Sequence, residues 1–380
     1  MIYLDNAATT KPYPEAVAKA AEIMAYTWGN PSSGHEFGAL ARLELDNARK
    51  IVANALGASP GEVYFTSGGT ESDNIAILGG CLASGKRHVV TTAIEHAAVA
   101  KTIRNLRREH GFAVDYIPLK GCRLDLEALE NTVTEQTSMV SVMLVGNEVG
   151  TIQPVAEISR IVKRKNPAAL LHCDAVQGFG KLPFTVDSLG VDMLSISAHK
   201  IGGIQGCGAL YLRSGTRIFA RQFGGGQENG LRSGTESVPL IAAFGEAARL
   251  TFASPEKNAV HMTDVRDYCI AELSRRFSTA VILTDKACAP HIISFTLPDT
   301  DAAQTVAALG NHGICISNGA ACQSNERDNK RGQALEAYGL TDAEIRSTLR
   351  VSLCSGNTRE DIDAMVAELL LHVQAQTAVL

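Results

Sequence analysis

Short apolar runs rich in β-branched residues alternate along the chain with longer segments of helical pattern. This alternation predicts strand–helix–strand units and a mainly parallel sheet buried between layers of helices. Seven runs are predicted to be strands: residues 63–66, 89–92, 114–118, 139–145, 170–173, 193–197 and 209–212. Helices are predicted between several of them, over residues 73–84, 97–110, 126–131 and 155–165. The expected fold class is therefore three-layer α/β.

The pattern changes after a helical stretch around residues 242–250, which ends near Ser254 and Pro255 in what we interpret as a hinge. Beyond it we predict a helix over 265–277, strands over 292–297 and 314–317, a polar stretch over 323–331 and a last helix from Glu360. We therefore expect a large domain of residues 13–256 and a smaller α+β domain of residues 257–380. Residues 1–12 are expected to belong to the smaller domain.

Composition excludes several classes of protein. The chain has 380 residues, of which 45% are hydrophobic and 20% are charged, so disordered and fibrous proteins are excluded. The net charge is -5, and the longest basic group is Arg104, Arg107 and Arg108, which gives no footprint for nucleic acid. No apolar run reaches the ~18 residues of a membrane span, and the first ten residues resemble no secretion signal. We expect a cytoplasmic protein that contacts no membrane.

The nine cysteines are scattered without a Cys-x-x-Cys pair. An odd number of unpaired cysteines in a chain of this length argues against a disulfide framework and against a structural zinc site. We expect no metal site. Most of the thiols are expected to be buried and small, with one or two left for chemistry.

A glycine-rich turn, Ser67-Gly68-Gly69-Thr70, follows the predicted strand 63–66. Two glycines expose backbone N–H groups, Thr70 adds a hydroxyl, and the following helix directs the positive end of its dipole at the turn. These features suit an anion, although an ordinary capped turn fits this segment equally well.

Two further residues stand where strands are predicted to end. Asp174 follows the strand 170–173. Lys200 lies shortly after the strand 193–197, and it is preceded by Ser197, the last strand residue, and by His199. Separately, they could be a helix-capping acid and a solvated surface amine. Together with the glycine turn they meet the needs of pyridoxal phosphate (PLP), whose phosphate, ring nitrogen and aldehyde require N–H donors, a carboxylate and an amine.

At this point the sequence resembles a known family, the NifS/IscS-type cysteine desulfurases in the class V aminotransferase group of PLP fold type I. The resemblance runs from residue 3 to about residue 360. Its motifs are YLDNAATT at 3–10, NPSSGH at 30–35, TSGGTESDN at 66–74, EH at 95–96, NEVGTIQP at 147–154, DAVQ at 174–177, SAHK at 197–200, and GGGQE and RSGTE between 224 and 236. So many motifs in one order make accidental agreement negligible.

The resemblance implies a role for each residue around the cofactor. Lys200 would bind PLP as a Schiff base and later move the substrate Cα proton. Asp174 would pair with the ring nitrogen, Gln177 would bond the ring hydroxyl, and His96 would stack on the ring. The phosphate would be held by Gly69, Thr70, Ser197, His199 and, from a partner subunit, Thr235. A homodimer is therefore expected.

The resemblance also implies the reaction. Arg350 and Asn147 would bind the carboxylate of L-cysteine, and Cys322 would be the nucleophile. L-alanine would be released, and a persulfide on Cys322 would pass to a sulfur-acceptor or iron–sulfur scaffold protein. Small residues before Cys322 and a polar segment after it favour an exposed, mobile loop.

Three places depart from the family pattern. Residues 203–207 read Gly-Ile-Gln-Gly-Cys where relatives have Gly-Pro-Lys-Gly, so we expect a looser turn, with Cys207 as a structural thiol rather than a sulfur relay. Residues 325–331 are more charged than in familiar members, which suggests an unusual acceptor surface. Cys354 replaces a frequent glycine and is expected to be buried.

Two alternatives to desulfuration stay open. One is a selenocysteine lyase or another PLP-dependent C–S lyase, since the same cofactor serves selenium or another leaving group. The other is a catalytically silent scaffold that only binds sulfur-transfer partners.

Overall fold

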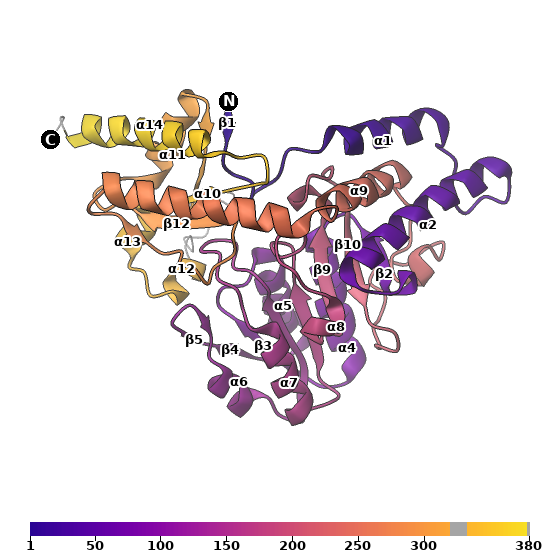
Figure 1. Cartoon of the computed structure of the whole chain (residues 1–380). Helices are drawn as coiled ribbons and strands as arrows, with labels where there is room; N and C mark the ends of the chain where they lie inside the picture. The colour runs from indigo at the N-terminus through magenta and orange to yellow at the C-terminus, as the bar shows by residue number, and fades with distance from the viewer. Residues whose placement is uncertain (320–332, 378–380) are drawn as a thin grey trace.

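A seven-stranded sheet forms the centre of the molecule (Figure 1). The computed structural model describes residues 1–319 and 333–377. The strands are β2 (Val63–Thr66), β3 (His88–Thr92), β4 (Ala113–Ile117), β7 (Thr137–Met143), β8 (Leu170–Asp174), β9 (Met193–Ser197) and β10 (Gly208–Leu212). Their order is β2-β10-β9-β8-β7-β3-β4, and only β10 runs antiparallel to its neighbours. The predicted mainly parallel sheet is confirmed.

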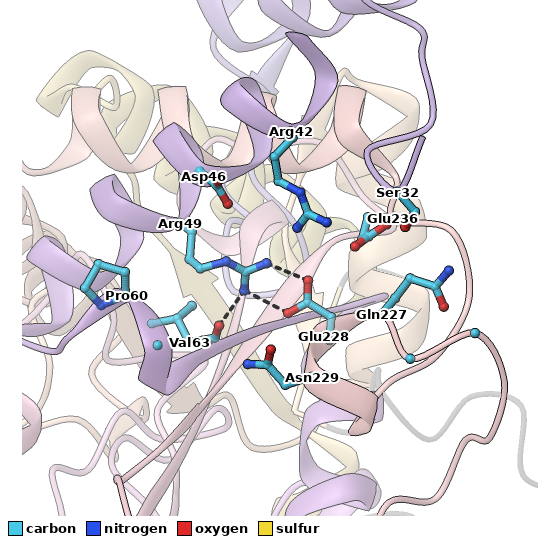
Figure 2. A pocket seen from close by; sticks show the side chains of 13 residues that line it. Ser32, Arg42, Asp46, Arg49, Pro60, Val63, Gln227, Glu228, Asn229 and Glu236 are labelled. Carbon is cyan, nitrogen blue, oxygen red and sulfur yellow. Dashed lines mark hydrogen bonds and ion pairs between the residues drawn. The ribbon is translucent and has the colours of Figure 1, made fainter. Parts of the chain in front are cut away.

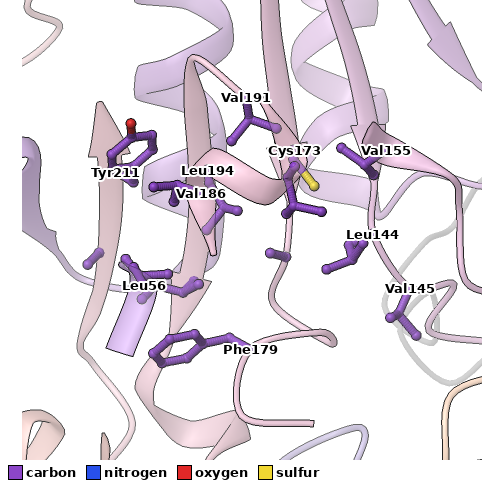
Figure 3. Packing of buried hydrophobic residues seen from close by; sticks show 14 of the residues in the cluster. Leu56, Leu144, Val145, Val155, Cys173, Phe179, Val186, Val191, Leu194 and Tyr211 are labelled. Carbon is purple, nitrogen blue, oxygen red and sulfur yellow. The ribbon is translucent and has the colours of Figure 1, made fainter. Parts of the chain in front are cut away.

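Helices cover both faces of this sheet because successive strand side chains point to opposite faces. Met139 and Met193 belong to one apolar cluster, whereas their neighbours Val140 and Leu194 belong to another. The first cluster includes residues of α4 (Gly80–Ser84) and α5 (Ala97–His110). The second, shown in part in Figure 3, includes residues of α2 (Glu36–Leu56), α7 (Val155–Lys165), α8 (Val186–Leu189) and α9 (Val238–Thr251). The three layers are therefore helices, sheet and helices.

Helix boundaries agree with the prediction in part. Both α5 and α7 span the predicted residues, and α6 (Leu126–Thr132) extends one residue further. The helix predicted over 73–84 begins earlier, as α3 (Gly69–Asn74), and continues through the π-type turn η2 (Ile75–Gly79) into α4. It can start at Gly69 because Gly68 has a φ of 153°, which lets the chain turn directly out of β2. Six of the described helices were not predicted: α1 (Pro14–Tyr26), α2, α8, α11 (Ala302–Asn311), α12 (Gln333–Ala337) and α13 (Asp342–Arg346).

A second, antiparallel sheet has the order β11-β12-β15-β14. Its strands are β11 (Val281–Ile282), β12 (Ile292–Thr296), β14 (Ser317–Asn318) and β15 (Thr348–Ser352). The run predicted over 314–317 is thus divided between β13 (Ile314–Cys315) and β14. An apolar cluster of its own joins this sheet to α10 (Pro255–Arg276), α11 (Ala302–Asn311) and α14 (Arg359–Thr377).

The chain start belongs spatially to this second region. Strand β1 (Ile2–Tyr3) pairs with β13, and Leu4 lies in the apolar cluster of the antiparallel sheet, so Figure 1 shows the indigo N-terminus among orange and yellow elements. The domain division at residue 256 stays a prediction. Helix α10 begins at Pro255, directly after Ser254. Within the described residues, no helix combines the length and the apolar character needed to cross a bilayer.

The contact between α2 and α9 gives a test of the packing. A methyl group on Gly245 of α9 would lie 2.9 Å from the Cα and Cβ of Ala48. We expect Gly245→Ala to lower the free energy of unfolding by about 1 kcal/mol or more, because overpacking outweighs the better helix propensity of alanine. Gly310 of α11 has no atom within 4 Å of its added methyl, so Gly310→Ala should raise stability by roughly 0.5–1 kcal/mol. Urea unfolding of both variants measures this, and equal effects would contradict it.

Candidate functional site

A cavity of about 350 Å³ lies where β3, β7, β8 and β9 end. Parallel strands place their carboxyl ends at one edge of the sheet, where α/β proteins bind ligands. The predicted site residues that line it are Gly69, Thr70, His96, Asn147, Asp174, Gln177, Ser197, His199 and Lys200. Arg350 and Thr235 do not line it, and Cys322 lies outside the described residues.

Lys200 ends the short helix η3 (Ala198–Lys200) that follows β9. Its Nζ donates hydrogen bonds to the carbonyl oxygens of Ala7 and Ala8, at 2.5 and 2.8 Å. The same Ala7 oxygen accepts a bond from Gln177 Nε2 at 2.9 Å. The N-terminal segment therefore forms one wall of the cavity and holds the amine inside it.

The corner of the cavity formed by Ser197 and Gly69 has features that suit an anion. Ser197 Oγ is buried and has no hydrogen-bond partner within the described residues. Beside it, Gly69 begins α3, and a methyl group there would lie 2.7 Å from Val176 Cγ2. Only glycine fits this approach, which leaves the backbone N–H accessible next to a hydroxyl that lacks an acceptor.

Asp174, at the end of β8, is the buried acid of the cavity. It forms a group with Asp73 and His96, in which a carboxylate oxygen of each acid and an imidazole nitrogen of His96 lie within 4.8 Å of one another. Burial raises the pKa of Asp174, whereas His96 and Lys200 oppose this rise. Burial in turn lowers the pKa of His96. The imidazole, which caps α5 by accepting a bond from Ala98 N, is thus favoured in its neutral form.

Asp73 is a cavity residue that the sequence analysis missed. Burial and the nearby Asp174 raise the pKa of this carboxyl well above its ordinary range. Behind it, His172 Nε2 lies 3.5 Å from Asp73 Oδ1 and 3.0 Å from Ser195 Oγ. Burial lowers the pKa of His172 to about 3, so its ring is neutral. The available signal was an acid one turn into the helix after the glycine turn, but placing the helix start at Asp73 concealed it.

Arg350 lies on β15 and is completely buried. Its Nη2 donates to Asp5 Oδ1 at 3.1 Å, and its Nη1 donates to the carbonyl oxygen of Asn147 at 2.9 Å. Glu148 Oε2 lies 4.0 Å from the same Nη1. Burial raises the pKa of Glu148 to about 7, while Arg350 opposes the rise. Asn147 links this guanidinium to the cavity, which its own side chain lines.

The loop that carries Thr235 is anchored by a buried ion pair (Figure 2). Arg49 of α2 donates to both carboxylate oxygens of Glu228, at 2.6 and 2.8 Å, and to the carbonyl oxygen of Val63. Glu228 also accepts a bond from Phe65 N at 2.9 Å. The loop is thereby fixed to β2 and α2, while Thr235 itself is exposed.

Two departures from the family pattern can be located. Cys207 is buried, as expected, and the turn before it is closed by bonds from Gly203 N and Ala198 N to the carbonyl oxygens of Ala198 and Cys207. These bonds form without the proline and the lysine of relatives. Cys354 is only half-buried, so its predicted burial is wrong: it lies just past β15, where the strand gives way to an exposed turn.

The pKa of Glu95 generates a test by pH. Glu95 accepts bonds from Thr92 Oγ1 and Met143 N through one oxygen, and burial raises its pKa to about 8. The folded chain thus keeps a proton that the unfolded chain loses above about 4.5, so this group lowers stability as pH rises from 4.5 to 8. Glu95→Gln removes that loss.

We expect the free energy of unfolding of Glu95→Gln, relative to that of wild type, to increase by roughly a few kcal/mol when the pH is raised from 5 to 8.5. Urea unfolding of both proteins at both pH values measures this. The exposed Glu127→Gln serves as the control and should show no such gain. A difference between Glu95→Gln and wild type that is the same at both pH values would contradict the assignment.

Comparisons with known proteins agree with this geometry. Residues 2–365 match the family described as aminotransferase class-V. A cysteine desulfurase of Trichormus azollae is 38% identical over 369 residues, which cover 96% of this chain and 91% of the relative. The cysteine desulfurase IscS of Dictyoglomus turgidum is 36% identical over 366 residues, or 95% and 92% of the two chains.

Solved structures agree as well. A NifS-like protein superposes with a TM-score of 0.92 at 37% identity, over 98% of this chain and 99% of that one. A NifS-like protein from Rickettsia africae gives 0.86 at 32% identity, over 97% and 98%. The fold is therefore that of PLP fold type I, and the chain belongs to the class V aminotransferase family, among its NifS/IscS-type cysteine desulfurases.

Proposed function

We propose that this chain binds PLP and removes sulfur from L-cysteine, giving L-alanine and a persulfide on Cys322. The observation that carries the proposal is one cavity that holds an amine, a buried carboxylate and an anion-binding end, from Lys200, Asp174 and the Gly69–Ser197 corner. Relatives named cysteine desulfurase support the substrate. So does a structure described as SspA in complex with cysteine, 30% identical with a TM-score of 0.79.

The cavity residues fit PLP at three points. The unpartnered Ser197 Oγ and the N–H of Gly69 suit the phosphate, together with Thr70 and His199. Burial lowers the pKa of His199 to about 4, so its ring is neutral and donates through one nitrogen only. Asp174 would bind the ring nitrogen, Gln177 the ring hydroxyl and His96 the ring face. When bound, PLP supplies an aldehyde that captures amines and a ring that accepts electrons from a carbanion.

Lys200 would act twice. Its Nζ already lies in the cavity, where Ala7 and Ala8 orient it through two carbonyl oxygens. It would hold the cofactor and, once the substrate amine has replaced it, take the proton from the substrate Cα.

Arg350 and Asn147 would bind the substrate carboxylate. The guanidinium has five N–H donors, and Asp5 and the Asn147 carbonyl occupy one each of its two terminal nitrogens. Because Arg350 is completely buried, the substrate carboxylate would have to share it with Asp5 or replace Asp5. Entry of substrate thus involves the N-terminal segment as well as β15.

The Cys322 thiolate would attack the sulfur of the bound cysteine. The carbon–sulfur bond then breaks, its electron pair stays with the substrate carbon, and that carbon takes up a proton to become alanine. The persulfide would pass to an acceptor protein for iron–sulfur cluster or thio-cofactor assembly in the cytoplasm. We further propose a homodimer, because Thr235 lies outside its own cavity on an exposed loop and would complete the phosphate site of a partner subunit.

Product analysis tests the reaction. Incubation with L-cysteine and a reductant should release alanine and sulfide in equal amounts, because each carbon–sulfur bond broken gives one of each. Cys322→Ser should lose persulfide formation and most sulfide release while still binding PLP. Pyruvate and ammonia as products would instead indicate a β-elimination enzyme, and a faster reaction with L-selenocysteine that survives Cys322→Ser would indicate a selenocysteine lyase.

Arg350→Lys tests the carboxylate site. Lysine keeps the charge but loses the paired donors, so we expect KM for L-cysteine to rise about 10-fold or more, with a smaller change in kcat. Arg266→Lys is a matched control, since Arg266 is a buried arginine on α10 that bonds the Cys288 carbonyl oxygen away from the cavity. An unchanged KM in Arg350→Lys, or an equal rise in Arg266→Lys, would contradict the role.

A further inference from the structure

A second cavity, of about 300 Å³, lies beside the first and shares no lining residue with it. It is formed where three segments continue past the cofactor cavity: residues 10–14 after Ala8, Gly180 and Lys181 after Gln177, and Ile201 and Gly202 after Lys200. Residues of the second region close it, among them Asn258, Met262 and Cys354. The cavity therefore lies between the apolar cluster that contains Ile201 and the apolar cluster of the antiparallel sheet, which contains Met262.

The charge of this cavity has one sign. Lys11 and Lys181 line it, and no aspartate or glutamate does among the described residues. Lys181 is partly buried, and its ammonium makes no hydrogen bond and no ion pair within the described part of the chain. The other half-buried lysines differ: Lys163 Nζ, for example, lies 2.6 Å from Asp192 Oδ2. Lys181 therefore lacks a counter-charge among the described residues. This is costly, because a desolvated ammonium without an acceptor is unfavourable.

Electrostatics at Lys181 agree with the geometry. Burial lowers the pKa of the Lys181 amine, and the Cys354 thiol is the group that opposes this fall. Burial and the charge of Lys181 also lower the pKa of the buried His291, which favours its neutral form. Among the residues that the structure describes, no carboxylate contributes to the pKa of Lys181, and none lines the cavity.

Neutral donors surround the same space. Tyr13, Asn258 and Ser355 line the cavity, and their side chains donate no hydrogen bond within the described residues. The cavity walls are fixed: Gly202 N donates to Thr10 Oγ1 at 2.7 Å, Tyr13 N donates to Gly202 O at 2.8 Å, and Thr251 Oγ1 donates to Ile201 O at 3.0 Å. Two cations and several unused donors in a fixed cavity match the acceptor-rich surface of an oxyanion.

We propose that this cavity is a binding site for a small dianionic oxyanion of the phosphate or sulfate class, with Lys181 as its main counter-charge and Lys11, Tyr13 and Asn258 as further donors. The site is separate from the corner that would hold the PLP phosphate. It is independent of the proposed reaction, because its residues belong to none of the roles assigned above.

Cys354 provides a local reporter, since its half-buried thiol lines the same cavity. The holoenzyme, with PLP bound, is treated with the neutral reagent iodoacetamide at constant ionic strength, and alkylation of Cys354 is followed by peptide mass spectrometry. We expect inorganic phosphate at ten times its Kd to slow alkylation about 10-fold, because only about one molecule in eleven then has an empty cavity. Chloride at the same ionic strength should give no protection.

Variants identify the cation responsible. Lys181→Gln should lose the protection, Lys181→Arg should keep most of it, and the matched control Lys50→Gln, an exposed lysine on α2, should behave as wild type. The wild-type arm decides the matter even if Lys181→Gln does not fold. Equal alkylation with and without phosphate, equal protection by chloride, or full protection in folded Lys181→Gln would each overturn the proposal, while leaving cysteine desulfuration untouched.

Discussion

The position of the Lys200 amine depends on a short N-terminal segment that both sheets hold. Ala7 N donates to Ser352 Oγ at 2.8 Å, and Asn6 Nδ2 donates to Ser352 O at 2.9 Å, which fastens the segment to β15 of the second sheet. On its other side the Ala7 carbonyl accepts bonds from Lys200 and Gln177. Asp5 of the same segment binds Arg350. Three consecutive residues, Asp5 to Ala7, thus connect the cavity at the edge of one sheet to the proposed substrate arginine of the other.

Burial gives the groups around this segment different charges. Lys200 and Asp174 both line the cavity; burial raises the pKa of Asp174, and Lys200 is one of the groups that oppose this rise. The imidazoles nearby are favoured as neutral rings, because burial lowers the pKa of His96, His172 and His199. The rings near Asp174 and Lys200 therefore add no positive charge to the cavity, which suits the proposal that one acid and one amine interact with PLP.

The sequence predicted those parts of the fold that have strong local signals. The seven central strands are apolar and bounded by turn residues, and α5 and α7 have a clear polar face, so all were found. Helices α1 and α2 escaped because their burial comes mainly from contact with α9, a partner more than 180 residues away in the chain. Residues that follow strand ends, such as Asp174 and Lys200, could be placed at one edge by topology alone. Asp73 was missed because the helix was predicted to begin at that residue and not at Gly69. The roles of the Ala7 and Ala8 carbonyls could not be predicted, because backbone contacts between distant segments leave no mark on residue type.

The central claim, that Lys200 is the amine that captures the cofactor, is tested most directly by chemical trapping. The purified protein is saturated with pyridoxal phosphate, reduced with borohydride, digested and analysed by mass spectrometry. The structure predicts a pyridoxyl group on Lys200 in close to one copy per chain, together with loss of the yellow absorbance. A protein that stays colourless with added cofactor, or a pyridoxyl group on another lysine in place of Lys200, would contradict the account.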